Sequence, residues 1–321
     1  MELRQLGQTE IRVSPVALGC WPIAGMTSSG VTDADSLATI AACFDLGINF
    51  LDTAYGYGTE GESERLIARA LGNRRDEMVI ATKAGIHWGP GRRQILDASP
   101  ARLRTECEES LRRLQTDRVE LLYLHAPDAT TPIAESAGEL KRLQEEGKAR
   151  AIGASNLNLV QLEAFAQACP LAAFQPAYNM LERQIEQDTL PWCVEHGVSV
   201  VVYWPLLKGL LAAKIARDHQ FPTTDSRSRY PMFQGDEWRK NHNFVDRLRA
   251  IATDAGKTVA ELVINWTIHQ PGITAALCGA KRPDQIRDNA GGMGWKLSAA
   301  QLAQIDAALL ARGPAATKSP V

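Results

Sequence analysis

Short apolar segments alternate with longer amphipathic segments along most of the chain, and this alternation limits the fold more than any other feature. We expect strands at residues 16–18, 48–51, 78–82, 119–124, 149–153, 172–175, 198–203 and 273–277. The segments between them have helical spacing, as in 101–114, where the apolar side chains are Leu103, Cys107, Leu111 and Leu114. Because parallel strands need crossover connections, the alternation predicts an α/β protein, a (β/α)₈ TIM barrel.

The main alternative is a doubly wound open sheet, which normally carries a glycine-rich turn after its first strand. No GxGxxG motif is present. Ser99 and Pro100 supply an N-cap and a first helical proline for 101–114. The polar first residues predict a short hairpin, and 237–255 and 298–310 predict two extra helices beside the barrel. Residues 206–237 form a long polar interruption of a kind that tends to be functional.

The composition is that of an ordinary globular protein. The 321 residues are 45% hydrophobic and 22% charged, with a formal net charge of −2, so neither nucleic acid nor a membrane surface is an expected partner. No signal peptide or membrane span is recognisable, and we expect one domain over 1–321, a frayed tail over 313–321, and a monomer in the cytoplasm. We expect neither disulfide nor zinc from the scattered cysteines, Cys20, Cys43, Cys107, Cys169, Cys193 and Cys278.

Reactive side chains follow three consecutive predicted strands. Asp52 and Tyr57 follow 48–51, Lys83 follows 78–82, and His125 follows 119–124. Active sites of (β/α)₈ barrels lie at the C-terminal ends of the strands, so these side chains can converge on one pocket. Taken singly, a loop Asp often caps a helix and a Lys after a strand is often solvated. Their joint placement favours a catalytic site.

The chemistry of such a group centres on the tyrosine. A phenol titrates near ~10 and is a poor acid unless a neighbour favours its ionised form. The Lys83 cation would do so, and Asp52 would keep Lys83 charged and oriented. We therefore expect Tyr57 to be a general acid with a lowered pKa, and His125 to hydrogen-bond a substrate carbonyl oxygen.

The segment LDTAYGYGTEGESERLIARAL, residues 51–71, resembles the signature of the aldo-keto reductase family. Further matches follow in family order: IATKAG with Lys83, LLYLHAPD with His125, IGASN, FQPAYNMLER and VVYWPLLKGLL. The resemblance covers 18–289 and is nearest to bacterial and plant branches of the family. It implies that Asp52, Tyr57, Lys83 and His125 form the catalytic tetrad of an oxidoreductase that reduces aldehydes or ketones, or oxidises alcohols.

The resemblance also implies NADP(H) as cofactor. Its carboxamide would be held by Ser155, Asn156 and Gln175, and Tyr203 would stack on the nicotinamide ring, fixing the face that offers hydride. Lys281 and Arg282 suit a 2′-phosphate and favour NADP over NAD. The remaining expected cofactor residues are Gly19, Cys20, Trp21, Asp52, Trp204, Pro205, Leu206, Lys208, Lys214, Arg227, Gly279, Gln285 and Asn289.

The substrate pocket is expected to contain Trp21, Tyr57, Trp88 and His125, with Met26 and Trp204 as weaker candidates. Ala126 stands where the family often has an aromatic residue, which leaves more space beside His125. There are two alternatives to the oxidoreductase function. One is a nucleotide-binding, redox-sensing subunit similar to channel beta subunits, which a complete tetrad disfavours. The other is a metal-assisted lyase, which needs clustered ligands that the sequence lacks.

Overall fold

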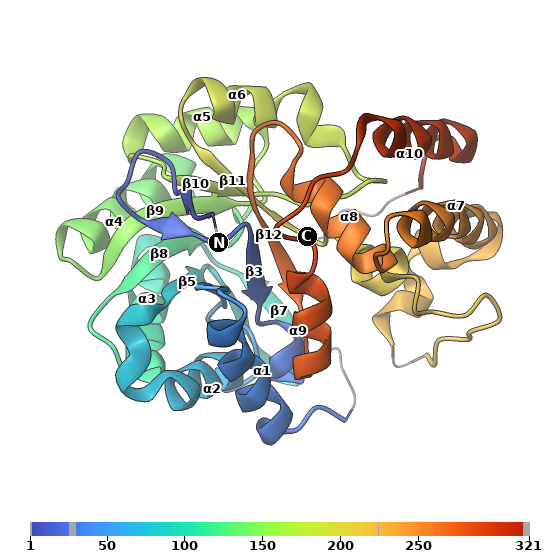
Figure 1. Ribbon diagram of the computed structural model, residues 1–321. Helices are drawn as coiled ribbons and strands as arrows, with labels where there is room; N and C mark the ends of the chain where they lie inside the picture. The colour runs from blue at the N-terminus through green and yellow to red at the C-terminus, as the bar shows by residue number, and fades with distance from the viewer. Residues whose placement is uncertain (1, 26–29, 224, 317–321) are drawn as a thin grey trace.

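A closed barrel of parallel strands forms the centre of the molecule, as the sequence predicts (Figure 1). The computed structural model describes residues 2–25, 30–223 and 225–316, so Met26 lies outside the described residues. The strands are hydrogen-bonded around the barrel in chain order, and the last pairs with the first. They are β3 (Val16–Gly19), β4 (Phe50–Asp52), β5 (Val79–Ala84), β8 (Val119–Leu124), β9 (Ala149–Ser155), β10 (Ala173–Gln175), β11 (Ser199–Tyr203) and β12 (Ile273–Gly279).

The strand boundaries differ from the sequence prediction by one or two residues for a physical reason. Ile48 and Val198 donate their backbone N–H groups to Cys43 and Cys193, the last turns of the preceding helices, so they terminate helices and do not join the sheet. At the other end, β5, β9 and β12 continue two residues further than predicted. Lys83 therefore lies within a strand.

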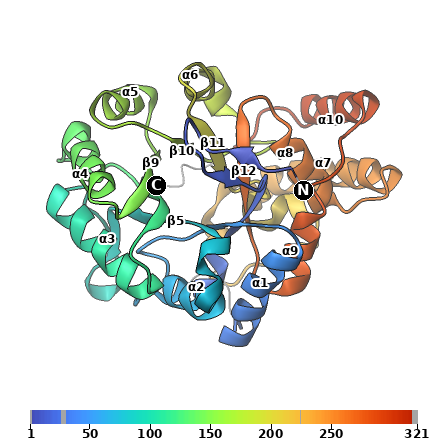
Figure 2. The same ribbon diagram turned by 60° about the vertical axis from the view of Figure 1, so that its left-hand side comes forward.

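Helices surround the barrel, as Figures 1 and 2 show from two directions. They are α1 (Asp33–Asp45), α2 (Glu62–Leu71), α3 (Pro100–Leu114), α4 (Ile133–Glu145), α5 (Leu159–Ala168), α6 (Thr189–Glu195), α8 (Val259–Ile268) and α9 (Pro283–Ala290). The prediction for 101–114 is confirmed by α3, with Pro100 in its first turn. Ser99 occupies the N-cap position, but its side chain makes no capping hydrogen bond, which corrects that part of the prediction.

The two extra helices are also confirmed. They are α7 (Gly235–Asp254) and α10 (Ala299–Arg312), which pack side by side outside the ring (Figure 1). The polar interruption before α7 folds into short 3₁₀ turns, Leu207–Ala212, Ser226–Arg229 and Pro231–Phe233. Their buried apolar side chains, including Leu211 and Met232, dock this segment onto the core.

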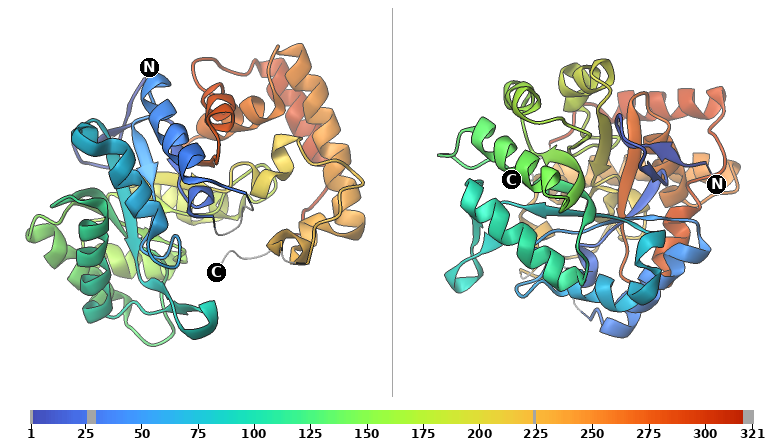
Figure 3. Two further views of the ribbon diagram at one scale, coloured as in Figure 1. Left: turned by 90° about the horizontal axis from the view of Figure 1, so that it is seen from below. Right: turned by 90° about the vertical axis from the view of Figure 1, so that its left-hand side faces the viewer.

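Two apolar layers hold the fold together. One lies between barrel and helices, and the other fills the barrel interior with residues such as Phe50, Ala81 and Tyr123. The hairpin predicted at the N-terminus, β1 (Arg4–Gln5) with β2 (Arg12–Val13), adds Leu6 and Val13 to the interior layer. This hairpin closes the N-terminal end of the barrel, because Gly7 N–H donates to Ser199 at the start of β11. The strands end at the opposite end of the barrel, and Figure 3 shows the ribbon from two further directions.

A second hairpin follows β5 and was not predicted. Its strands are β6 (Ile86–Trp88) and β7 (Gln94–Leu96). At the other end of the chain, where the sequence predicts fraying, Arg312 hydrogen-bonds Gly313 and Pro314, and Glu237 accepts from Ala316 N–H. Residues 317–321 lie outside the described residues. All six cysteines are buried free thiols. No helix in the described part of the chain has the length and apolar character needed to cross a membrane.

Candidate active site

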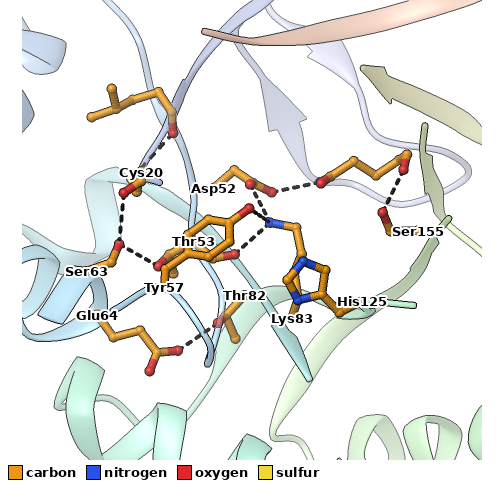
Figure 4. A network of polar contacts seen from close by, with 12 residues as sticks. Cys20, Asp52, Thr53, Tyr57, Ser63, Glu64, Thr82, Lys83, His125 and Ser155 are labelled. Atoms are coloured by element: carbon orange, nitrogen blue, oxygen red, sulfur yellow. Dashed lines mark hydrogen bonds and ion pairs between the residues drawn. The ribbon is translucent and has the colours of Figure 1, made fainter. Parts of the chain in front are cut away.

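The alternation of side chains along the strands aims three of the predicted catalytic residues at one point. Phe50 and Ala81 face the barrel interior, so Asp52 and Lys83, two residues further along β4 and β5, share that inward face. Tyr123 also points inward, which places His125 on the same face just after β8. These strands are neighbours in the barrel. The convergence predicted from sequence is present (Figure 4).

Lys83 and Asp52 form a buried ion pair. Lys83 Nζ lies 2.5 Å from Asp52 Oδ1 and donates a second hydrogen bond, of 2.8 Å, to the Thr53 carbonyl oxygen. Each side chain is only 1% exposed, so its charge depends on these partners. Burial lowers the pKa of Lys83, but the Asp52 carboxylate and Tyr57 outweigh it, and the pKa lies above its ordinary value. Lys83 is therefore a fixed cation.

The Tyr57 hydroxyl accepts a hydrogen bond of 3.3 Å from Lys83 Nζ. Enclosure by protein raises the pKa of Tyr57, and the charge of Lys83 offsets only part of the rise. The sequence-based expectation of a lowered pKa is therefore wrong, because burial outweighs the lysine. The phenol stays protonated at neutral pH, as a proton donor must, while Lys83 stabilises the phenolate left after donation.

His125 is held as a neutral imidazole. Burial, and then the charge of Lys83, place its pKa well below the ordinary value. Its Nδ1 is buried and has no hydrogen-bond partner in the described residues. The His125 and Tyr57 rings meet edge to face with centroids 5.9 Å apart, and Trp21 meets Tyr57 in the same way at 5.0 Å. An imidazole beside the phenol can donate a hydrogen bond to an oxygen that also contacts Tyr57.

A chain of hydrogen bonds joins the residues expected to hold the carboxamide. Gln175 Nε2 donates to Asp52 Oδ2 at 2.8 Å, and Ser155 Oγ donates to the Gln175 carbonyl oxygen at 2.7 Å. Asn156 Nδ2 donates to Ser155 Oγ, while its Oδ1 accepts from the Tyr203 hydroxyl at 2.7 Å. The four side chains meet as predicted, next to the tetrad.

The segment after β11 turns sharply beside this group. Trp204, Leu207 and Lys208 have φ values of 60°, 42° and 54°, a left-handed conformation that non-glycine residues adopt at a free-energy cost. Lys208 Nζ lies 4.0 Å from the centre of the Trp204 ring, and 4.6 Å from that of Tyr230. Pro205 is buried, and the Leu206 carbonyl oxygen accepts from Gly209 N–H within the same turn. Lys208 is thus placed next to the Tyr203 strand end.

Two of the expected cofactor cations in the 206–237 segment have acidic partners. The Arg227 guanidinium donates to both carboxylate oxygens of Asp225. Lys214 Nζ lies 2.5 Å from Asp288 Oδ2 on α9. The second contact ties the segment to α9, the helix that follows Lys281 and Arg282. A phosphate there would compete with Asp288 for Lys214.

The segment that carries Lys281 and Arg282 begins where β12 ends beside β3, with Gly279 paired to Gly19. A Cβ on Gly279 would lie 2.9 Å from Pro22 Cγ, so this glycine makes room for Pro22. Gln285 Oε1 accepts from Lys281 N–H at 2.9 Å, and Asn289 Nδ2 donates to the Gly279 carbonyl oxygen. These contacts shape the turn itself.

The side chain of Arg282 takes no part in these contacts. Its guanidinium donates to both carboxylate oxygens of Asp284, and the two exposed side chains form a surface ion pair. Cys20, also expected to contact cofactor, is buried with its thiol directed to the Leu18 carbonyl oxygen. Trp88, expected as a substrate wall, donates its indole N–H to the Gly56 carbonyl oxygen at 2.9 Å.

Sequence reasoning missed a buried polar layer behind the tetrad (Figure 4). Thr82 points outward from β5 and donates to Glu64 Oε1 at 2.8 Å, and Ser63 shares a 2.8 Å hydrogen bond with Thr53. Glu64 is fully buried, and burial raises its pKa. The signal was available, because Ser63 and Glu64 belong to the segment 51–71 that resembles the family signature.

Within the described ranges, no group of three or more His, Cys, Asp or Glu side chains is arranged to hold a metal ion.

A model of the aldo/keto reductase family matches residues 15–310, and the chain belongs to this family of oxidoreductases. It is 36% identical to the aldo-keto reductase YhdN of Bacillus subtilis (strain 168) over 301 residues, 93% of this chain and 90% of that protein. It is 34% identical to the NADH-specific methylglyoxal reductase of Escherichia coli (strain K12) over 308 residues, 91% and 94% of the two chains.

Among solved structures, the chain is similar to the glycerol dehydrogenase AKR11B4 from Gluconobacter oxydans. The TM-score is 0.91 at 37% identity, covering 99% of this chain and 98% of the other. Members of the family use nicotinamide cofactors. The (β/α)₈ fold and the family expected from the sequence are confirmed.

Proposed function

We propose that this protein is an NADPH-dependent aldo-keto reductase that reduces aldehydes or ketones to alcohols, or catalyses the reverse oxidation, with Tyr57 as the general acid or base. The observation that carries the proposal is the contact between the Tyr57 hydroxyl and Lys83 Nζ, 3.3 Å apart and backed by buried Asp52. A protonated phenol next to a fixed cation can give a proton to a nascent alkoxide.

In the forward direction, His125 and Tyr57 bind the carbonyl oxygen between them and polarise the C=O bond. A bound nicotinamide cofactor supplies the hydride that adds to the carbonyl carbon. The O–H bond of Tyr57 breaks as the proton passes to the substrate oxygen, and Lys83 stabilises the resulting phenolate until solvent returns a proton. In the reverse direction, the Tyr57 phenolate accepts the alcohol proton.

The side chains at the strand ends fit a nicotinamide. Ser155, Asn156 and Gln175 offer hydroxyl and amide groups suited to a carboxamide, and the Tyr203 ring stands next to them through its bond to Asn156. We propose that these residues orient the carboxamide and that Tyr203 stacks on the ring. Bonding of Gln175 to Asp52 would connect cofactor placement to the tetrad.

We propose NADP over NAD because of Lys281. Arg282 and Lys214 already pair with Asp284 and Asp288, so Lys281 is the cation on which a 2′-phosphate contact mainly rests. The Escherichia coli relative is named NADH-specific, so family membership does not decide this choice.

The substrate classes to test follow from the relatives' names, a methylglyoxal reductase and a glycerol dehydrogenase. We propose a small aldehyde, ketone or alcohol as substrate, with Trp21 and His125 lining the pocket. We also propose that the chain acts as one barrel domain, as a monomer in the cytoplasm. Size-exclusion chromatography with light scattering tests the monomer, and a mass of two chains would contradict it.

The deciding experiment is a fluorescence titration with NADPH and NADH, followed by absorbance-monitored NADPH consumption with a panel of carbonyl compounds that includes methylglyoxal. Turnover that prefers NADPH supports the proposal. Tight binding without turnover in either direction, including glycerol oxidation, would instead support the nucleotide-sensing alternative.

A further inference from the structure

The β6–β7 hairpin reaches from the Lys83 strand to the loop that carries Tyr57. Its residue Trp88 donates the indole N–H to the carbonyl oxygen of Gly56 across 2.9 Å. Gly56 immediately precedes Tyr57 in the chain. The hydrogen bond therefore acts on the peptide unit that joins the loop to the proton donor.

The backbones of the hairpin and the loop also touch at this point. A Cβ on Gly56 would lie 2.7 Å from the carbonyl oxygen of Ile86, closer than real Cβ contacts, and Gly56 is buried. Only glycine fits here without a shift of one backbone or the other. Two separate contacts, one polar and one steric, thus locate the residue before Tyr57.

The base of the hairpin is itself fixed to the scaffold. The Gly85 N–H, just before β6, donates to the buried carboxylate of Glu106 on α3 at 2.6 Å. The Ala98 N–H, just after β7, donates to Asp128 Oδ2, also at 2.6 Å. Because Asp128 lies in the loop that follows His125, the hairpin bridges the segments of Tyr57 and His125.

We infer that Trp88 is a positioning residue that holds the Tyr57 loop through the Gly56 carbonyl, and that it does not primarily select substrate. This role rests on the proposed function, since it presumes that Tyr57 transfers the proton. The contact between the Tyr57 hydroxyl and Lys83 Nζ is 3.3 Å, near the long limit of a hydrogen bond. A small displacement of the loop would break it.

The consequence is a specific kinetic signature. Trp88→Phe keeps the ring but removes the N–H, so kcat should fall roughly tenfold, the effect expected of losing one hydrogen bond that orients a reacting group. The fall should be equal for a small and a bulky aldehyde, because positioning acts on the common proton transfer. KM should change less than about twofold.

The pH dependence of kcat/KM distinguishes a positioning role of Trp88 from a purely structural one, because loss of structural support alone would not shift it. Lys83 lowers the pKa of Tyr57, whereas burial, Asp52 and Cys20 raise it. If the phenol moves away from Lys83 Nζ, the lowering effect weakens and the alkaline limb of kcat/KM should shift to higher pH in Trp88→Phe.

Trp295→Phe is the matched control, because it also loses one indole N–H bond to a backbone carbonyl, that of Gly291 at 2.8 Å. Its kcat should equal that of the wild type at saturating cofactor. Gly56→Ala is the second test variant and should lower kcat in the same substrate-independent way, with circular dichroism confirming its fold.

The experiment is the measurement of kcat, KM and pH profile for wild type, Trp88→Phe, Gly56→Ala and Trp295→Phe with both aldehydes. An equal loss of kcat in the first two variants, with a shifted alkaline limb, supports the positioning role. Unchanged kcat in Trp88→Phe, or an effect confined to the KM of the bulky aldehyde, overturns it. Absence of turnover in the wild type overturns the proposed function, and the positioning role with it.

Discussion

The side-chain amide of Gln175 lies 2.8 Å from Oδ2 of Asp52, the carboxylate whose other oxygen pairs with Lys83. Gln175 thus contacts the ion pair that adjoins Tyr57. It also belongs to the set of side chains proposed to hold the cofactor carboxamide. The buried ion pair and the residues proposed to hold the cofactor carboxamide are parts of one hydrogen-bonded unit at the C-terminal end of the barrel (Figure 4).

Tyr57→Phe should lower kcat by about 10² to 10⁴, the range typical of a lost general acid. NADPH affinity should change less than about twofold, because the phenol hydroxyl hydrogen-bonds Lys83, which is not among the predicted cofactor residues. Steady-state kinetics and a fluorescence titration measure the two quantities. Turnover at wild-type rate would remove Tyr57 from its proposed role.

Asp52→Asn should destabilise the protein by about 3–5 kcal/mol, because it leaves the buried Lys83 ammonium without its counter-charge. The double variant Asp52→Asn with Lys83→Met removes both charges and should recover much of that stability while remaining inactive. Urea denaturation provides the free energies of unfolding. Equal stability of the two variants would show that the ion pair does not carry the effect.

Lys281→Ala should weaken NADPH binding by roughly 10- to 100-fold, the size of one charge-assisted hydrogen bond, and leave NADH binding within about twofold. Arg282→Ala is the control on the neighbouring cation, which is exposed and paired with Asp284, and it should change NADPH affinity much less. Equal losses for both cofactors in Lys281→Ala would assign the 2′-phosphate contact to another residue.

The stability of the protein should fall as the pH drops below about 6.5, in part because of His125. Burial holds its pKa in the folded state well below the ordinary value of a histidine, so in this range the unfolded chain binds a proton that the folded chain does not. One such group contributes a slope of up to about 1.4 kcal/mol per pH unit. Denaturation of wild type and His125→Asn at several pH values should show a shallower slope for the variant; identical slopes would exclude this contribution.

The barrel was predictable because the sequence patterns that specify its strands and helices are local and recur along the chain. Each strand is a short apolar run, and each crossover helix has one apolar face, so both can be recognised without knowing their partners. The convergence of Asp52, Lys83 and His125 was predictable for the same reason, since these residues occupy equivalent places at the ends of their apolar runs. The first residues of two strands were mispredicted, because the backbone N–H groups of Ile48 and Val198 donate to the preceding helices and not to the sheet.

The features that sequence did not reveal depend on distant partners. Lys214 and Asp288 are 74 residues apart, and their contact follows only from the folded geometry. The sign of the pKa shift of Tyr57 was mispredicted because burial, which decides it, is a property of the assembled site. The β6–β7 hairpin lacks clean alternation and has exposed apolar residues, Ile95 and Leu96, so its sequence resembles a loop.

The most direct test of the central claim compares wild type and Tyr57→Phe in one assay, NADPH consumption with methylglyoxal and a panel of other aldehydes and ketones. The account predicts carbonyl-dependent oxidation of NADPH by the wild type and its loss in the variant, with NADPH binding retained by both. Oxidation at equal rates in the two proteins, or none in either despite tight NADPH binding, would contradict it.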